Sequence, residues 1–297
     1  MKSIDSPFSS ESVRCAGTLL LPDTSGVPPV VIMAHGFGLI RAAGLMAFAE
    51  RFLALGLAAF LFDYRSFGDS DGEPRHWISP RRHLQDWKAA LLHVRSLPEI
   101  DGERVVLWGT SFSGGHVLET AARDNNVSAV IAQVPHVDGS ASTSQTPALA
   151  KLGLGAAGIL DFVGGGFGRP VYRQIVGHPG ELAAITGREA WDGYMGIIPK
   201  SARWENKTRA QIFLEMPFYS PIRHVQSIKA PTLIIAARSD TVTPANAARA
   251  TAERLPNGRF ELLEGNHFEP YSGAVFEKNI ALQVDFLKAQ KLLSRDQ

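Results

Sequence analysis

Apolar and polar residues follow two patterns along this chain, and these patterns predict its strands and helices. Short apolar runs, typical of buried strands, occupy residues 29–34, 57–62, 105–110, 127–132, 230–237 and 259–263. Between them, apolar residues recur at helical spacing, as Leu45, Phe48, Ala49 and Phe52 do within 42–55. Strands that alternate with helices predict an α/β fold with a mostly parallel, doubly wound sheet, preceded by antiparallel strands within 11–21.

The pattern breaks between residues 135 and 221. This stretch lies between two strand-like runs and contains glycine-rich and helix-like pieces. It therefore predicts a helical cap (135–221) inserted into a core made of residues 1–134 and 222–297. We expect most of its large apolar side chains to pack within the cap and some to line a substrate pocket. They are Phe162, Phe167, Tyr172, Trp191, Tyr194, Trp204, Phe213, Phe218 and Tyr219.

The third apolar run ends abruptly at a serine that has small neighbours. Gly109 precedes Ser111 by two positions, and residues 113–115 (Ser-Gly-Gly) follow it before a helical pattern begins. A strand that turns sharply into a helix, with serine at the apex, is the nucleophile elbow of serine hydrolases. The usual motif has glycine where this chain has Ser113. The alternative is that Ser111 is an ordinary helix N-cap, but the flanking strand and glycines favour the elbow.

A carboxylate and a histidine follow two later strands of the predicted sheet. Asp240 comes after the run 230–237, just before Thr243 and Pro244, which we expect to be the N-cap and first residue of a helix. His267 comes after the last run. Because the carboxyl ends of parallel strands meet at one edge of a sheet, where ligands bind, both side chains are expected there.

The chain order of these residues is itself informative. Ser111, Asp240 and His267 follow the order of the α/β-hydrolase triad. Serine needs a histidine to remove its proton, and the histidine needs a carboxylate to orient it. Asp138, in the loop after the run 127–132, is a second candidate for the acid. The sequence predicts a Ser-His-Asp triad with Asp240 as its first-choice carboxylate.

An oxyanion hole is predicted beside this triad. The strand-like run 29–34 leads into a glycine-rich turn at 35–38 (His-Gly-Phe-Gly). Backbone N–H groups stabilise an oxyanion when they are unpaired and aimed in advance, and such turns suit that role. We assign the two donors to the N–H groups of Phe37 and Phe112.

Together these segments resemble the α/β-hydrolase superfamily along almost the whole chain. The resemblance rests on residues 35–38, 63–68 (Asp-Tyr-Arg-Ser-Phe-Gly), the Ser111 turn, Asp240 before Pro244, and 265–267 (Gly-Asn-His). Within the superfamily the chain is similar to bacterial esterases related to the catalytic domain of X-Pro dipeptidyl-peptidases, and to polyketide transferases. Ser66 stands where such proteins often have glycine. The resemblance implies the α/β-hydrolase fold and esterase, thioesterase or acyl-transfer chemistry.

We therefore expect a serine hydrolase that cleaves carboxylic esters or thioesters of small, apolar substrates through an acyl-enzyme. An acyltransferase would use the same residues and pass the acyl group to a bound acceptor. A non-catalytic ligand-binding protein on a hydrolase scaffold is the alternative from another class. Asp63 and Arg65 are expected to hold loops together, and His116 is expected to pack against the sheet.

Composition narrows the range of partners. The 297 residues are 45% hydrophobic, and 30 basic residues nearly balance 29 acidic ones, for a formal charge of +1. Without a long basic run, nucleic acid is not an expected partner. No segment reads as charge-free and long enough to span a bilayer, and the first residues lack a signal-peptide core. We expect a cytoplasmic protein that acts on small molecules, with a homo-oligomer left open.

Neither a metal nor a cofactor is expected. The nine histidines include no H-x-x-x-H pair, and the single Cys15, in a predicted edge strand, has no thiol partner. Residues 153–158 match the dinucleotide pattern G-x-G-x-x-G. That pattern carries meaning only after a strand, and the preceding residues 148–152 are helix-prone.

Overall fold

The computed structural model describes residues 1–24, 26–144, 146–290 and 292. Its centre is an eight-stranded sheet of order β1-β4-β6-β5-β7-β8-β12-β13. β1 and β4 are antiparallel to their neighbours, whereas the strands from β6 to β13 pair in parallel. The bounds are β1 Lys2–Asp5, β4 Gly17–Leu21, β5 Pro29–Ala34, β6 Ala58–Phe62, β7 Asp101–Thr110, β8 Ala129–Gln133, β12 Thr232–Ala237 and β13 Gly258–Leu263.

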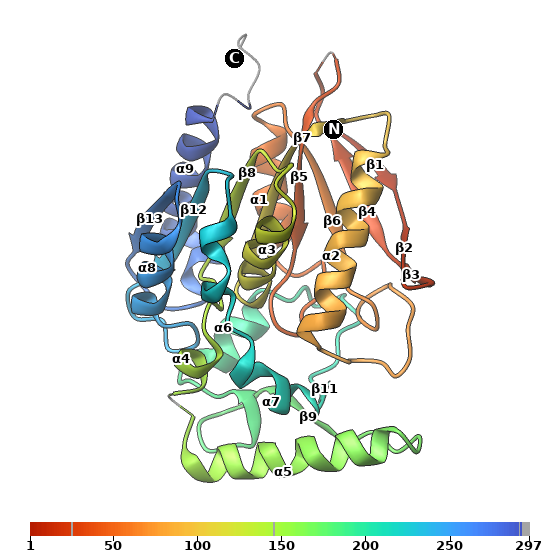
Figure 1. The fold of residues 1–297 in the computed structure, drawn as a ribbon, viewed down its shortest axis with the longest axis vertical. Coiled ribbons are helices and arrows are strands. Elements are labelled where there is room, and N and C mark those ends of the chain that lie inside the picture. The colour runs from red at the N-terminus through yellow and green to blue at the C-terminus, as the bar shows by residue number, and fades with distance from the viewer. Residues whose placement is uncertain (25, 145, 291, 293–297) are drawn as a thin grey trace.

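Helices cover both faces of this sheet (Figure 1). α1 and α9 contact one face, and α2, α3 and α8 contact the other. Their bounds are α1 Leu45–Leu53, α2 Pro80–Arg95, α3 Phe112–Arg123, α8 Ala245–Arg254 and α9 Gly273–Ala289. A separate two-stranded ribbon, β2 (Phe8–Ser10) with β3 (Val13–Cys15), precedes β4. Cys15 is fully buried there, and burial raises the pKa of its thiol.

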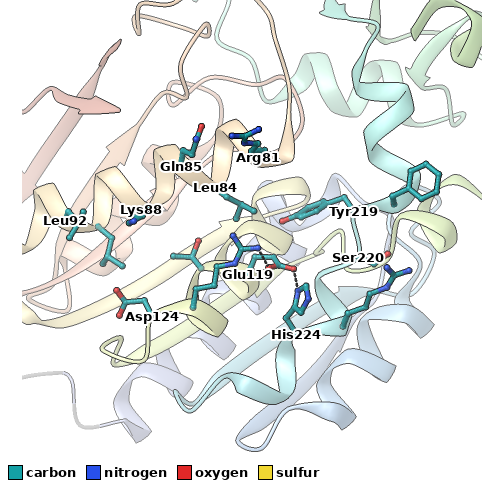
Figure 2. A pocket seen from close by; sticks show the side chains of 15 residues that line it. Arg81, Leu84, Gln85, Lys88, Leu92, Glu119, Asp124, Tyr219, Ser220 and His224 are labelled. Atoms are coloured by element: carbon teal, nitrogen blue, oxygen red, sulfur yellow. Dashed lines mark hydrogen bonds and ion pairs between the residues drawn. The ribbon is translucent and has the colours of Figure 1, made fainter. Parts of the chain in front are cut away.

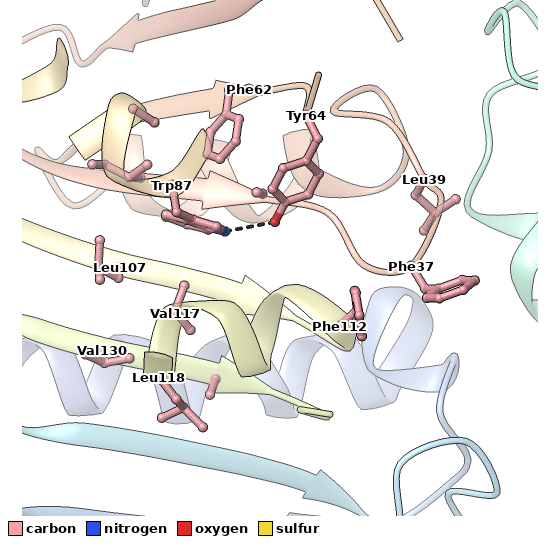
Figure 3. Packing of buried hydrophobic residues seen from close by; sticks show 14 of the residues in the cluster. Phe37, Leu39, Phe62, Tyr64, Trp87, Leu107, Phe112, Val117, Leu118 and Val130 are labelled. Carbon is pink, nitrogen blue, oxygen red and sulfur yellow. Dashed lines mark hydrogen bonds between the residues drawn. The ribbon is translucent and has the colours of Figure 1, made fainter. Parts of the chain in front are cut away.

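The central strands are apolar on both sides because both faces are covered. Along β5, Val30 and Ile32 belong to the core on the side of α2 and α3, while Val31 and Met33 belong to the core under α1 and α9. Figure 3 shows the first of these cores, in which Trp87 packs among strand and helix side chains. This alternation explains why the sequence shows continuous apolar runs there.

The segment between β8 and β12 forms irregular structure at one end of the sheet. α5 runs along its outer side, with β9, β11 and α7 between α5 and the sheet (Figure 1). The bounds are α4 Gly139–Thr143, α5 Ala148–Gly165, β9 Tyr172–Val176, β10 Ala183–Ile185, α6 Ala190–Gly196, β11 Thr208–Arg209 and α7 Ile212–Glu215, with 3-10 turns at Met216–Phe218, Pro221–Arg223, Val225–Ser227 and, after β13, Glu269–Tyr271.

The fold expected from the sequence is confirmed, with corrections at the margins. The helix expected within 42–55 spans only α1, and α8 begins after Pro244, so Pro244 rather than Thr243 takes the N-cap position. The expectation that no segment is long and apolar enough to span a bilayer is wrong. Among the described residues α5 passes that test, with 22% of the stretch buried.

Most of the nine large apolar side chains of 135–221 are buried or partly buried, as expected, but three are not. Phe162, Phe167 and Phe218 are exposed. Tyr194 and Phe213 are buried as expected.

Two ion pairs hold the loops at the sheet's edge, as expected for Asp63 and Arg65. Asp63 accepts hydrogen bonds from the backbone N–H and the guanidinium of Arg41. Arg65 is buried and pairs with Asp86 on α2, which also accepts a hydrogen bond from the Ser10 hydroxyl at 2.6 Å. The second pair therefore ties the loop after β6 to α2 and to the β2–β3 ribbon.

Replacing Asp86 with alanine leaves the buried Arg65 guanidinium without its carboxylate. We expect the free energy of unfolding to fall by about 3–5 kcal/mol, because an uncompensated buried charge is costly. Urea unfolding followed by circular dichroism measures it. The control, Glu277→Ala, breaks the exposed Arg51–Glu277 pair and should cost at most about 1 kcal/mol. Equal losses in the two variants would contradict this role for the buried pair.

Candidate active site

The turn between β7 and α3 places Ser111 in a conformation that L-residues rarely adopt. Its φ is 55° and its ψ is −119°. The side chain makes no capping hydrogen bond to α3, so Ser111 is not an ordinary N-cap. The turn is so tight that a Cβ at Gly109 would lie 2.2 Å from the carbonyl oxygen of Ser113. Glycine is therefore required at position 109, and the strained serine is pushed out of the helix.

Ser113, which departs from the usual motif, has a partner in this structure. Its hydroxyl lies 2.8 Å from the hydroxyl of Tyr64, and the indole N–H of Trp87 donates to the same Tyr64 oxygen at 2.8 Å. Figure 3 shows the Trp87–Tyr64 bond. Tyr64 belongs to the segment 63–68, so the polar side chain that replaces glycine after the turn is satisfied by a neighbouring loop.

A buried amide network lies beneath the turn. The side-chain carbonyl oxygen of Gln133 accepts hydrogen bonds from the side-chain amides of Asn279 at 2.6 Å and Gln283 at 3.1 Å, both on α9. Gln283 in turn accepts from the indole N–H of Trp108 at 2.7 Å, and the Gln133 amide donates to Thr110 at 3.1 Å. Because all five residues are buried, the network fixes the ends of β7 and β8 against α9. No pattern in the sequence predicts this network.

The structure brings Ser111, His267 and Asp240 together at the edge where β7, β12 and β13 end. The hydroxyl oxygen of Ser111 lies 3.0 Å from Nε2 of His267, and Nδ1 of His267 lies 2.7 Å from a carboxylate oxygen of Asp240. The three side chains are almost completely buried. This hydrogen-bonded series can move a proton from the serine to the histidine while the carboxylate stabilises the imidazolium.

Thr243 holds the carboxylate in place, a role the sequence analysis did not foresee. Its hydroxyl oxygen lies 2.9 Å from the Asp240 oxygen that faces His267, and 2.9 Å from the Val134 carbonyl oxygen. The other Asp240 oxygen accepts from the backbone N–H groups of Val242 and Thr243 at 2.8 and 2.7 Å. The spacing Asp-x-x-Thr was the available signal, since a carboxylate often accepts backbone N–H bonds two and three residues later.

Asp138, the second candidate acid, makes different contacts. It is the N-cap of α4, and one of its oxygens accepts hydrogen bonds from the backbone N–H groups of Ser140 at 2.8 Å and Ala141 at 3.2 Å. Asp138 therefore caps the start of α4, whereas the carboxylate that contacts His267 is that of Asp240.

The two amides proposed for the oxyanion hole lie next to Ser111. Among the described residues, the N–H groups of Phe37 and Phe112 have no hydrogen-bond acceptor. Phe112 is the first residue of α3, where helices leave N–H groups unpaired. The rings of Phe37 and Phe112 pack edge to face at 5.3 Å, and both residues line a cavity with Ser111. A Cβ at Gly36 would lie 2.9 Å from Cβ of Ser111, so this loop approaches the serine closely.

Two aromatic side chains from the segment 135–221 fix the same loop. The Tyr194 hydroxyl donates to the Phe37 carbonyl, and the indole N–H of Trp204 donates to the Gly38 carbonyl at 2.8 Å. Both donors act on backbone carbonyls and leave the Phe37 N–H free to point elsewhere. Tyr194 and Trp204 appear in the sequence analysis only as large apolar side chains of the expected cap.

Two small cavities reach Ser111. One, of about 50 Å³, has the apolar side chains of Ala184, Ile185, Met216 and Val242 in its lining. The other, of about 10 Å³, is lined by His267 and by Tyr194, Ile197 and Phe268 among others. Ile185 lines both, as do Phe37 and Ser111.

His136 also lines the larger of these cavities, where a backbone carbonyl holds its ring. Burial lowers its pKa to about 4, so the ring is neutral at pH 7. Its Nε2 donates to the Tyr219 carbonyl at 3.2 Å. Burial likewise lowers the pKa of His116 well below its usual range, and its ring packs against Phe112 and Tyr64.

A larger hollow lies away from Ser111. Figure 2 shows this groove of about 740 Å³ between α2, α3 and residues 218–224. The buried Glu119 on its floor accepts a hydrogen bond from His224 at 2.6 Å and pairs with Arg123. None of Ser111, Asp240 and His267 lines it, so size alone does not identify the site of chemistry here.

Comparisons with known proteins agree with this fold. The model of the alpha/beta hydrolase family matches residues 31–277. The quorum-quenching protein AidA of Acinetobacter baumannii is 40% identical over 286 residues, 96% of this chain and 94% of that protein. The thiohydrolase aneE of Aspergillus aculeatus is 25% identical over 94% of this chain and 90% of its own length.

A solved structure and a further relative in sequence are also similar to this chain. The crystal structure of the alpha/beta hydrolase GrgF from Penicillium superposes with a TM-score of 0.83 at 25% identity, covering 98% of this chain and 99% of that one. The polyketide transferase grgF of Penicillium is 26% identical over 265 residues, 88% of this chain and 87% of that protein. Since the family model covers most of its length, the chain belongs to the alpha/beta hydrolase family.

Proposed function

We propose that this protein is a serine hydrolase that cleaves carboxylic esters or thioesters through an acyl-enzyme. The observation that carries the proposal is the unbroken hydrogen-bonded series from Ser111 through His267 to Asp240. In the first half-reaction the Ser111 oxygen attacks the substrate carbonyl while His267 takes its proton. His267 then protonates the departing alcohol or thiol, and a water molecule releases the acid by the reverse sequence.

The oxyanion formed at each attack needs donors that are free beforehand. We assign this role to the N–H groups of Phe37 and Phe112, which have no acceptor among the described residues. Each such donor contributes roughly 3–4 kcal/mol to lowering the barrier in related chemistry. Tyr194 and Trp204 act as positioning residues, because they hold the backbone of residues 37 and 38.

The proposed substrate is small and apolar on its acyl side. The cavity beside Ser111 takes its apolar lining from Ala184, Ile185 and Met216 of the segment 135–221 and from Phe37, Phe112 and Val242 outside that segment. We therefore propose that residues 135–221 form a cap that shapes the acyl site. Relatives named as a thiohydrolase and a polyketide transferase support ester, thioester and acyl-transfer chemistry as a class.

The triad assignment predicts unequal losses from two aspartate substitutions. Asp240→Asn should lower kcat on p-nitrophenyl esters by roughly 10⁴-fold, because the amide favours the wrong histidine tautomer. Asp138→Asn is the matched control and should lose less than about tenfold, since it disturbs only the start of α4. Ser111→Ala should abolish measurable turnover. The assignment fails if Asp138→Asn is the more damaged aspartate variant, and an inactive wild type would favour the ligand-binding alternative.

The acyl site predicts a dependence on chain length. From acetate upward, kcat/KM for p-nitrophenyl esters should first rise with each methylene buried in the apolar cavity and then fall when the space is filled. Ile185→Ala removes a side chain that lines both small spaces and should move the optimum to longer chains, with Leu97→Ala, which lines neither space, as control. A steady decline from acetate in wild type would exclude an apolar acyl site.

The relative named as a polyketide transferase makes acyl transfer the second candidate function. A thioester substrate incubated with rising concentrations of alcohols or amines separates the two. A hydrolase should give the free acid as its main product at every concentration, with both products lost in Ser111→Ala. Dominant ester or amide formation at millimolar acceptor would instead identify a transferase.

A further inference from the structure

α5 has two apolar faces, of which only one is used within the chain. Leu154, Ala157, Gly158 and Asp161 are buried against the rest of the segment 135–221. The opposite face is bare: the exposed fractions are 83% for Leu149, 71% for Leu152, 57% for Ile159, 61% for Leu160 and 57% for Val163. Figure 1 shows that α5 lies at the outer limit of the molecule, with no element of the described residues beyond it. Exposed apolar patches of this kind mark interaction sites.

The spacing of the bare face is that of a helix-pairing seam. Leu149, Leu152, Ala156, Ile159 and Val163 recur at alternating intervals of three and four residues, the pattern by which one helix packs along another. The partner expected from this spacing is therefore a helix.

The same face is nearly symmetric about its midpoint, Ala156. Leu152 and Leu160 lie four residues on either side of it, and Leu149 and Val163 lie seven residues on either side. If two copies of α5 pack antiparallel around a two-fold axis at Ala156, Leu152 of each lies beside Leu160 of the other. Leu149 likewise meets Val163. A two-fold interface requires this self-complementarity.

The small residues at the centre fit a close approach of two helices. A Cβ at Gly155 would meet no atom of the described residues within 4 Å, so no contact among them requires glycine there. Glycine weakens the interior of an exposed helix relative to alanine. A second backbone passing near Gly155 and Ala156 accounts for both small residues.

We propose that α5 is the dimer interface of this protein, pairing antiparallel with α5 of a second copy around Ala156. Charge favours this occupant. The only charged side chains of α5 are the exposed Lys151 and Asp161, which is buried against Arg209. The exposed apolar face of α5 is therefore suited to pack against another uncharged face. A membrane-surface helix carries more Lys and Arg beside its apolar stripe.

The size of the seam predicts a dimer of limited strength. An 18-residue helix is about 27 Å long, and an interface built mainly on one such pair falls near the lower end of specific interfaces, about 1,200 Å² in total. The chain that leads into α5 borders the proposed acyl site, because Ser142, Thr143 and Thr146, just before α5, line the cavity beside Ser111.

Sedimentation velocity over a concentration series tests the interface, and paired charges test its register. Wild type should move from monomer to dimer as concentration rises. In Leu152→Glu/Leu160→Glu, like charges meet, and the dimer should weaken at least a hundredfold. In Leu152→Glu/Leu160→Lys, opposite charges meet in the antiparallel register, and the dimer should be largely restored. A wild-type monomer at several hundred micromolar, or a dimer insensitive to the double Glu variant, would overturn the proposal.

A disulfide locates the axis. Ala156→Cys should form a covalent dimer when its two thiols are oxidised by copper phenanthroline, whereas wild type should not, because Cys15 is buried. Leu160→Cys is the matched control: its two copies lie about 12 Å apart along the helices, beyond the reach of a disulfide. Equal cross-linking of both variants would contradict the register. Binding of wild type to anionic vesicles with no dimer in solution would assign α5 to a membrane instead. Circular dichroism and esterase activity verify that each variant is folded.

Discussion

The strained backbone at Ser111 is the constraint on which the rest of the site depends. An L-residue at φ 55° and ψ −119° carries roughly 1–3 kcal/mol of strain, and the surroundings must hold it there. The Ser111 N–H donates to the Gln133 carbonyl at 2.8 Å, and the Ser111 carbonyl accepts from the His136 N–H at 2.8 Å. The amide network through Gln133 and α9 supports both. The result is a serine hydroxyl directed away from α3 and toward His267.

The sheet edge and the segment 135–221 both contribute side chains to the space around Ser111. The core supplies Ser111, His267 and Asp240 at the ends of three strands, and Thr243 orients the carboxylate. The segment 135–221 supplies Tyr194, which holds the loop that carries the Phe37 N–H. The side chains of Ser111, His267 and Asp240 are buried, so little water screens them. Their electrostatic interactions are therefore stronger than they would be at the surface. A displacement of the segment 135–221 would therefore alter both the proposed acyl space and the loop proposed to bind the oxyanion.

Much of this arrangement could be predicted from the sequence, since strands buried on both faces leave long apolar runs and a nucleophile turn requires small residues at fixed places. The loops carrying Asp240 and His267 follow such runs, which is why their common edge was foreseeable. The amide network was not, because Gln133, Asn279 and Gln283 are scattered polar residues whose meeting depends on where α9 docks. The exposure of Phe162 and Phe167 was also missed. A helix that is apolar on both faces has the same composition whether both faces are buried or one of them is exposed. Composition alone therefore does not predict which face is exposed.

The most direct test of the account is to treat the folded protein with a fluorophosphonate and map the adduct by mass spectrometry. A serine activated by a neighbouring histidine attacks such a reagent, whereas an ordinary surface serine does not. The account predicts one adduct, on the peptide that contains Ser111. An adduct on another residue, or none on folded protein, would contradict it.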